Sequence, residues 1–134
     1  MIRILHWCCD QTMTEALNQV DLTASQGRLM AFVAHRGERP TYARDVEAEL
    51  HMTHPTVSGL LSRLEQKGFV ETKPGESDKR CRRVNQTEKA VWVHGEIEAC
   101  GKAQEEKLLD GFTEEEKVRL YEYLDRLWEN AKKL

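Results

Sequence analysis

Several features on which catalytic and secreted proteins depend are missing from this chain. Its four cysteines, at positions 8, 9, 81 and 100, include no C-x-x-C pair, and no spacing of His and Cys matches a zinc ligand set. No glycine-rich phosphate loop or Ser/His/Asp order marks an enzyme. No signal peptide or apolar run of bilayer length is present. We therefore expect a cytoplasmic protein with reduced thiols and without enzymatic activity, cofactor, metal or membrane association.

Length and charge set further limits. A chain of 134 residues that is 40% hydrophobic can bury one core but has little room for a second, so we expect a single domain over residues 1–134. The net charge of -3 is unevenly spread. Residues 53–89 hold eight Lys and Arg against five Asp and Glu, and the remainder holds twelve against eighteen. A locally basic segment on an acidic body can attract phosphate groups.

The basic segment begins with a helical pattern. Its apolar residues recur at the spacing of one helix face, which predicts that this face is buried: Val57, Leu60, Leu61 and Leu64. The side chains on and beside the opposite face are small, polar or basic and include no acid: Pro55, Thr56, Ser58, Gly59, Ser62, Arg63 and Gln66. Thr53 can cap the start of this helix and Gly68 can end it. A helix with such a face can lie in the major groove of a DNA duplex.

A strand, a turn and a second strand are predicted after this helix. Phe69–Thr72 has the pattern of a strand, Pro74 and Gly75 favour a turn, and residues 79–84 return as the second strand. Because alternate residues of a strand point to opposite sides, we expect Arg80 and Arg82 to share one side. A two-stranded ribbon with a charged tip, directly after a helix of this kind, indicates a winged helix-turn-helix.

Short motifs follow one another along residues 20–90: Leu22-Thr23 with Gln26, Pro55-Thr56-Val57-Ser58, Arg63-Leu64-Glu65, Lys67-Gly68, Asp78-Lys79-Arg80 and Thr87-Glu88-Lys89. This ordered set resembles the MarR family (multiple antibiotic resistance regulator) of bacterial transcriptional regulators. The resemblance implies a mostly α fold with a small two- or three-stranded β-wing, in which residues 22–89 form the winged helix-turn-helix. Residues 1–21 and 90–134 would then form a helical dimerisation region.

The resemblance also implies a function, namely that of a sequence-specific transcriptional regulator. We expect a homodimeric repressor that binds a pseudo-palindromic operator in double-stranded DNA and that a small-molecule effector releases. The residues expected to contact DNA are Thr53, His54, Thr56, Ser58, Ser62 and Arg63 in the helix, and Lys79, Arg80 and Arg82 in the wing. Asp78 matches an acid that, in the family, forms an ion pair with the wing arginine and fixes its direction. Arg44, in the preceding helix, is either a phosphate contact or a solvated arginine.

The segments on both sides of this region are predicted to be helical. Expected helices run over residues 2–20, from a capping box at Thr23 and Gln26 to Gly37, over residues 42–51 behind a Thr41 cap, over residues 87–109, and after a second capping box at Thr113 and Glu116. The last helix has apolar residues in alternating steps of four and three, as in a coiled coil: Leu120, Leu124, Leu127, Ala131 and Leu134. Either a dimer interface built from both termini or an intrachain core would use this seam.

Three kinds of signal could control such a protein. A small aromatic effector would occupy a pocket between the dimer helices and the winged domain, with Trp7, Phe32 and Trp92 as candidate lining residues. The adjacent Cys8 and Cys9 could form a redox switch, although buried structural cysteine is the commoner case. Metal sensing has weaker support, because His6 near the two cysteines completes no ligand set. A winged-helix module that binds protein instead of DNA is the alternative from another class.

Overall fold

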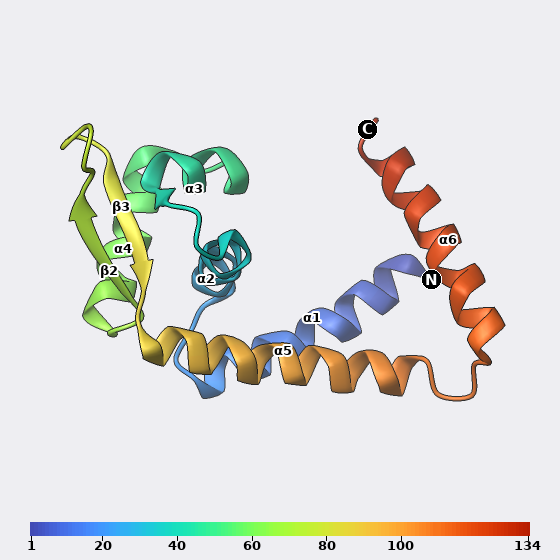
Figure 1. Ribbon diagram of the computed structural model, residues 1–134. Helices are drawn as coiled ribbons and strands as arrows, with labels where there is room; N and C mark the ends of the chain where they lie inside the picture. The colour runs from blue at the N-terminus through green and yellow to red at the C-terminus, as the bar shows by residue number, and fades with distance from the viewer. The chain divides into compact units, whose positions relative to one another are not determined.

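The computed structural model describes all residues of the chain, from Met1 to Leu134. Its helices and strands (Figure 1) are α1 (Ile2–Gln19), α2 (Ala24–Arg36), β1 (Thr41–Tyr42), α3 (Ala43–Leu50), α4 (His54–Gln66), β2 (Val70–Pro74), β3 (Arg82–Gln86), α5 (Glu88–Leu108) and α6 (Glu114–Ala131). The expected mostly helical fold with a small wing is confirmed. The chain forms two compact units, Met1–Gly101 and Lys102–Leu134. None of its helices combines the length and apolar character needed to cross a bilayer.

Most helix boundaries follow the capping residues that the sequence contains. At the start of α2 the Thr23 hydroxyl accepts a hydrogen bond from the Gln26 amide at 3.3 Å, and the Gln26 side chain accepts one from the Thr23 amide at 3.1 Å. Thr113 and Glu116 make the same reciprocal pair at the start of α6. After α4, Gly68 has a φ of +77°, a left-handed value that glycine adopts without steric cost.

Two predicted boundaries are wrong, and both errors involve the sheet. Thr41 does not cap α3; it is buried in β1, and the Asp45 carboxylate accepts the hydrogen bond of the Tyr42 amide at 2.9 Å at the start of α3. The returning strand begins at Arg82 and not at residue 79, because the loop closes on itself before that point. The Gly75 amide donates to the Cys81 carbonyl at 2.7 Å. Arg80 therefore lies in a turn, and its expected strand alternation with Arg82 does not apply.

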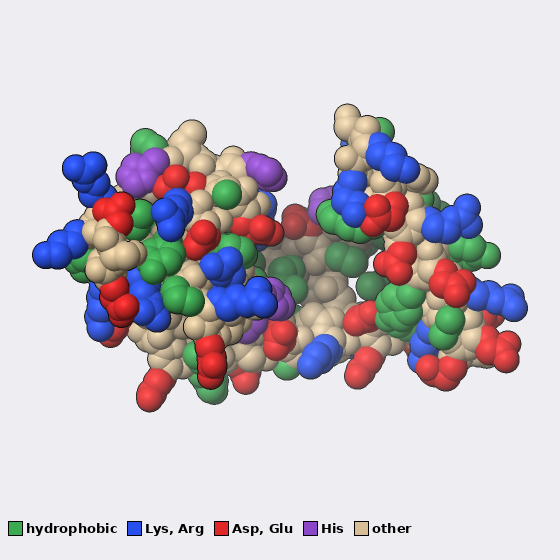
Figure 2. All heavy atoms as spheres, turned by 45° about the horizontal axis from the view of Figure 1, so that its top comes forward, with side chains coloured by type: hydrophobic (Ala, Val, Ile, Leu, Met, Phe, Trp, Pro, Cys, Tyr) green, Lys and Arg blue, Asp and Glu red, His purple; other side chains and the backbone are tan.

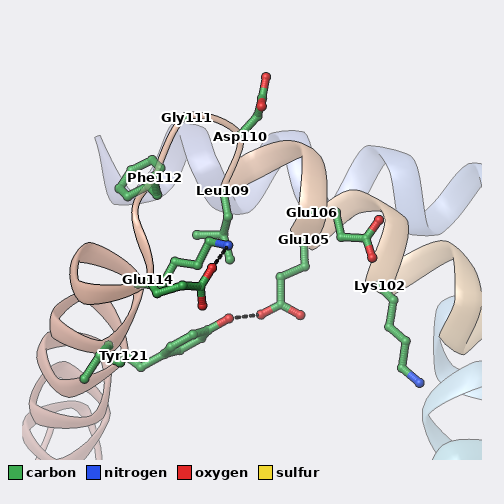
Figure 3. Close-up of a pocket in the computed structure, with 11 residues that line it drawn as sticks. Lys102, Glu105, Glu106, Leu109, Asp110, Gly111, Phe112, Glu114 and Tyr121 are labelled. Atoms are coloured by element: carbon green, nitrogen blue, oxygen red, sulfur yellow. Dashed lines mark hydrogen bonds and ion pairs between the residues drawn. The ribbon is translucent and has the colours of Figure 1, made fainter.

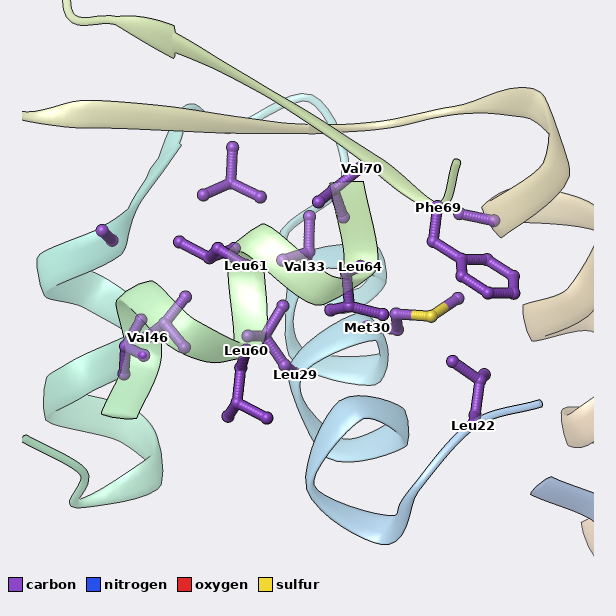
Figure 4. Packing of buried hydrophobic residues seen from close by; sticks show 14 of the residues in the cluster. Leu22, Leu29, Met30, Val33, Val46, Leu60, Leu61, Leu64, Phe69 and Val70 are labelled. Carbon is purple, nitrogen blue, oxygen red and sulfur yellow. The ribbon is translucent and has the colours of Figure 1, made fainter. Parts of the chain in front are cut away.

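The sheet and five helices of the first unit, α1 to α5, enclose one hydrophobic core. The strand order is β1-β3-β2 with antiparallel pairing, and Val84 of β3 stands opposite both Thr41 of β1 and Thr72 of β2. Figure 4 shows α4 side chains converging with those of α2, α3 and the sheet. The apolar face predicted for α4 is confirmed, because all its members are buried: Val57, Leu60, Leu61 and Leu64. This burial turns the polar face of α4 to solvent.

The C-terminal end of α4 is bonded to its neighbours on both sides. The Lys67 ammonium donates to the Asp21 carbonyl at 2.6 Å and to the side chain of the buried Gln26 at 3.2 Å. The Lys89 ammonium, in the first turn of α5, donates to the Lys67 carbonyl at 2.7 Å. The Thr87 hydroxyl, just before α5, donates to the Gly68 carbonyl at 2.7 Å. These bonds join α4 to the α1–α2 connection and to the start of α5.

The second unit contains the last turns of α5, a short connection and α6. No residue of α6 is buried, and its apolar side chains remain exposed, among them Val118, Tyr121, Leu124, Leu127 and Trp128. Within this unit the Tyr121 hydroxyl donates to the Glu105 carboxylate at 2.5 Å, across a pocket of about 660 Å³ (Figure 3). That hydrogen bond raises the pKa of Tyr121. The seam of α6 thus forms no intrachain core.

Candidate nucleic-acid interface

The exposed face of α4 carries the helix residues predicted to contact DNA. Thr53, His54, Thr56, Ser62 and Arg63 are exposed, and Ser58 is half-buried. At the start of the helix the Thr53 and Thr56 hydroxyls are hydrogen-bonded at 2.9 Å. Short hydroxyl groups and one arginine on a solvent-facing helix are the kinds of group that hydrogen-bond phosphates and base edges.

His54, the first residue of α4, has a partner that the sequence did not indicate. Its Nδ1 lies 2.6 Å from Glu47 Oε1 of α3. The imidazole itself is largely exposed, with 74% of its side-chain surface accessible, whereas Glu47 is mostly covered. Glu47 therefore orients the ring while leaving its other nitrogen open to a ligand. No local spacing signals this pair, because the two residues belong to separate helices.

Lys79 and Arg80 lie at the tip of the wing, in the turn between β2 and β3. Both are exposed, and neither side chain forms a hydrogen bond or ion pair within the chain. The ion pair expected between the Asp78 and Arg80 side chains is absent. Asp78 instead accepts hydrogen bonds from the Arg80 backbone amide at 2.9 Å and from the Cys81 thiol at 3.7 Å. Asp78 thus fixes the backbone of the tip and leaves the Arg80 guanidinium unpaired.

Arg82 lies at the base of the wing and has different surroundings. Its guanidinium donates to the Thr72 hydroxyl of β2 and lies 3.6 Å from the Glu65 carboxylate of α4. The Glu65 carboxylate also accepts hydrogen bonds from the Thr72 amide and hydroxyl, each at 2.8 Å. The sequence did not predict this cluster, because its members come from three different elements.

The hydrogen bonds from Thr72, first from its amide and then from its hydroxyl, lower the pKa of Glu65 below its ordinary value of 4.5, and burial opposes this shift. The nearby charge of Arg82 lowers the pKa further. A carboxyl group with a depressed folded-state pKa stabilises the folded form above its ordinary pKa, and that contribution is lost as the pH falls through the lowered value. Glu65 is therefore charged, and the cluster intact, at neutral pH.

Basic side chains gather at the end of the first unit that carries the wing. Figure 2 shows Lys and Arg side chains projecting at the left edge, where the wing lies, with acidic side chains among them. Arg44 of α3 is exposed, and its guanidinium lies 5.3 Å from the centre of the Tyr42 ring. This stacking holds the stem of Arg44 while leaving the charge accessible, which is compatible with a phosphate contact.

Gly75 permits the close turn that forms the wing tip. A Cβ added at this position would lie 2.6 Å from the Asp78 carbonyl oxygen and 2.9 Å from the Cys81 carbonyl oxygen, both backbone atoms. We expect G75A to open the loop, so that trypsin cleaves after Lys79 or Arg80 several-fold faster than in the unsubstituted protein. G59A is the matched control, because no atom lies within 4 Å of a Cβ there and alanine stabilises a helix by about 0.5–1 kcal/mol over glycine. Equal cleavage rates in G75A and the unsubstituted protein would show that this contact does not hold the loop.

The three aromatic residues predicted to line an effector pocket do not come together. Trp7 and Trp92 are more than 60% exposed, at 62% and 64% respectively, and Phe32 borders a separate open groove beside Leu50. Within the single chain these three residues therefore share no pocket, and their role in an effector site remains a prediction from sequence.

A different pocket lies between α1, α2 and α5 of the first unit. Its volume is about 360 Å³ and its walls are mainly apolar, with Met13, Leu17, Met30 and Ile97 among the lining residues. His35 of α2 and His94 of α5 also line it, with their rings edge to face and 6.0 Å between centroids. Polar groups on mostly apolar walls are typical of small-molecule sites.

Cys8 and Cys9 lie side by side on α1, where Cys8 is exposed and Cys9 is half-buried. This position on an outer helix leaves their role as a redox switch a prediction from sequence alone.

Comparison with known proteins is consistent with this geometry. Residues 20–80 match the family model described as the MarR family. The uncharacterized HTH-type transcriptional regulator YybA of Bacillus subtilis (strain 168) is 28% identical over 121 residues, which cover 84% of this chain and 80% of YybA.

Solved structures share the fold. MepR, a transcription regulator of the Staphylococcus aureus multidrug efflux pump MepA, has a TM-score of 0.83 and 22% identity, covering 97% of this chain and 95% of MepR. The MepR–DNA complex has a TM-score of 0.77 at 22% identity, covering 98% of this chain and 97% of that one. At this identity the likeness establishes the winged-helix fold.

Proposed function

Because residues 20–80 match the MarR family model and the chain has the winged-helix fold, we propose that it is a sequence-specific DNA-binding transcriptional regulator of that family. The observation that carries the proposal is the pairing of two surfaces on one winged helix. The exposed face of α4 supplies hydroxyl groups and Arg63, with Glu65 as an exposed acid only at the end that meets the wing, and the wing tip supplies the unpaired Lys79 and Arg80. A recognition helix in the major groove with an arginine-bearing wing beside it is a common mode of duplex binding. The MepR–DNA complex shows that a protein of this fold binds DNA.

The regulator acts, in this proposal, as a homodimer. The apolar seam of α6 has no partner within the chain, and the N-terminal end of α1 likewise exposes Ile2, Ile4, Leu5 and Trp7. Contiguous apolar surface of this kind is typical of a protein interface. Two recognition helices related by a two-fold axis would meet successive major grooves about 34 Å apart, so the operator is a pseudo-palindrome. A dimer across a promoter blocks polymerase without further contacts, which favours repression.

A small, mainly apolar molecule is the proposed effector. The pocket between α1, α2 and α5 supports this part of the proposal, because it borders both the winged helix and the helices assigned to the dimer. His35 and His94 offer hydrogen-bonding groups to such a molecule. Occupation of this pocket would bias the orientation of α5 and so the separation of the two winged helices.

The experiment that tests the function is a gel-shift series at several salt concentrations. The probe is a duplex enriched by the protein itself from a pool with a randomised centre. Salt-sensitive, sequence-dependent retardation supports the regulator, and loss of retardation on adding planar aromatic compounds supports the effector. No retardation even at low salt would favour a winged-helix module that binds protein.

A further inference from the structure

The base of the wing is bonded directly to the last turn of α4 through three side chains. Glu65 of α4 accepts two hydrogen bonds from Thr72 of β2, and Arg82 of β3 donates to Thr72 and approaches Glu65 at 3.6 Å. Each of the three elements contributes one residue. We refer to Glu65, Thr72 and Arg82 as the wing clamp.

The strength of the wing clamp lies in the hydrogen bonds and not in the ion pair alone. Glu65 and Arg82 are each more than a third exposed, and an ion pair between such groups contributes little by itself. The same carboxylate, however, receives two hydrogen bonds of 2.8 Å from one residue, and hydrogen bonds to a charged acceptor are stronger than neutral ones. The Thr72 hydroxyl is shared, donating to Glu65 while accepting from Arg82.

This arrangement separates the wing arginines into two kinds. The Arg80 side chain has no partner in the chain, so its full charge is available to a phosphate. Arg82 has already used guanidinium donors on Thr72, and the Glu65 carboxylate compensates part of its charge. Contact with a DNA phosphate would therefore gain less binding free energy from Arg82, whose charge is already partly compensated, than from the unpaired Arg80.

We propose that Glu65, Thr72 and Arg82 are positioning residues that set the angle of the wing against the recognition helix, and that Arg82 acts through this clamp without touching DNA. The inference rests on the proposed DNA-binding function and deepens it. It replaces the sequence-based prediction that Arg82 is a DNA contact. The wing angle decides whether Lys79 and Arg80 reach the duplex when α4 lies in the major groove, so an acid in the helix becomes necessary for binding a polyanion.

The sign of the effect of E65Q tests the clamp. Removing a negative charge beside DNA should by simple electrostatics strengthen binding, whereas loosening the clamp should weaken it. We expect E65Q to lower affinity for the selected duplex about tenfold, because the neutral amide oxygen of glutamine accepts the Thr72 hydrogen bonds more weakly than the carboxylate and carries no charge to pair with Arg82. T72V, which removes the hydroxyl without changing charge, should act in the same direction.

E71Q is the matched control for E65Q. Glu71 is exposed and lies next to Thr72 but outside the clamp, and its substitution removes the same charge. E71Q should leave affinity unchanged or raise it slightly.

The salt dependence of binding distinguishes a positioning residue from one that binds phosphate. Removing one phosphate-binding cation from each of the two subunits lowers the slope of log affinity against log salt by about 2 in magnitude. We expect R82Q to weaken binding at every salt concentration with an unchanged slope, and E65Q with R82Q together to be no worse than R82Q alone. A slope reduced by about 2 in R82Q, or tighter binding by E65Q, would overturn the proposal.

The hydrogen-exchange rate of the Thr72 amide tests whether the clamp forms in the absence of DNA, because that amide donates a hydrogen bond to Glu65. We expect faster exchange at Thr72 in E65A, which removes the acceptor oxygen, and no change in E71A. If the unsubstituted protein failed to bind any duplex, the proposed function would be wrong, but this measurement would still test the clamp. Unchanged exchange at Thr72 in E65A would refute the clamp itself.

Discussion

Replacing Leu127 by glutamate is expected to convert the proposed dimer into a monomer and to abolish operator binding. Leu127 lies on the exposed apolar seam of α6, 49% accessible in the single chain. Burying an unpartnered carboxylate there would cost about 2 kcal/mol or more in each copy. A two-fold interface contains the substitution twice, so the dimer dissociation constant should rise at least about 10³-fold. Operator binding falls with it, because a monomer presents only one recognition helix.

Sedimentation equilibrium over a range of protein concentrations measures this change, with circular dichroism confirming that the helices persist. R126Q is the matched control, since Arg126 is the neighbouring residue off the seam and its substitution also makes the net charge one unit more negative. R126Q should remain dimeric and bind DNA. If L127E also stayed dimeric with full affinity, the α6 seam would not be the interface.

R80A is expected to reduce operator affinity about 10²-fold per dimer, from about 1.5 kcal/mol in each subunit. The physical reason is that the Arg80 guanidinium at the wing tip is exposed and unpaired, so its charge is available to the duplex. The salt slope should fall by about 2 in magnitude, one phosphate-binding cation per subunit. Thermal stability should not change, because the side chain forms no hydrogen bond or ion pair within the chain.

Fluorescence anisotropy at several salt concentrations gives both the affinity and the slope. K102A removes the same charge from an exposed position on α5, outside the interface, and should leave both quantities unchanged. If R80A bound the operator as tightly as the unsubstituted protein, the wing tip would not be part of the DNA interface, and α4 alone would contact the duplex.

Local patterns predicted the parts of the fold that depend on local chemistry. The burial of Val57 and Leu61 follows from helical spacing, and the Thr23–Gln26 pair and Gly68 define helix ends through bonds or dihedral angles within a few residues. The assignment of Thr41 failed because β1 pairs with β3, far along the chain, and that pairing outweighed its capping tendency.

The candidate site was predictable to the same extent. Polar residues on the exposed face of α4 follow directly from the burial of the opposite face. The partners of those residues do not, because Glu47 approaches His54 from α3, and Glu65 meets Thr72 and Arg82 across three elements. Asp78 was recognised as important by resemblance, but its contact is with the Arg80 backbone. Residue identity therefore indicated the surface, and tertiary packing decided which charges on it are free.

The bonds that Lys67, Gly68, Thr87 and Lys89 make at the end of α4 have a mechanical consequence. Because these hydrogen bonds connect the end of α4 directly to the start of α5, we expect the two helices to move together as one rigid body. In the proposed dimer, the distance between the two α4 helices would then depend on the angle between the two α5 helices. A small change in that angle would be amplified along α5 and could shift the two α4 helices out of register with successive major grooves.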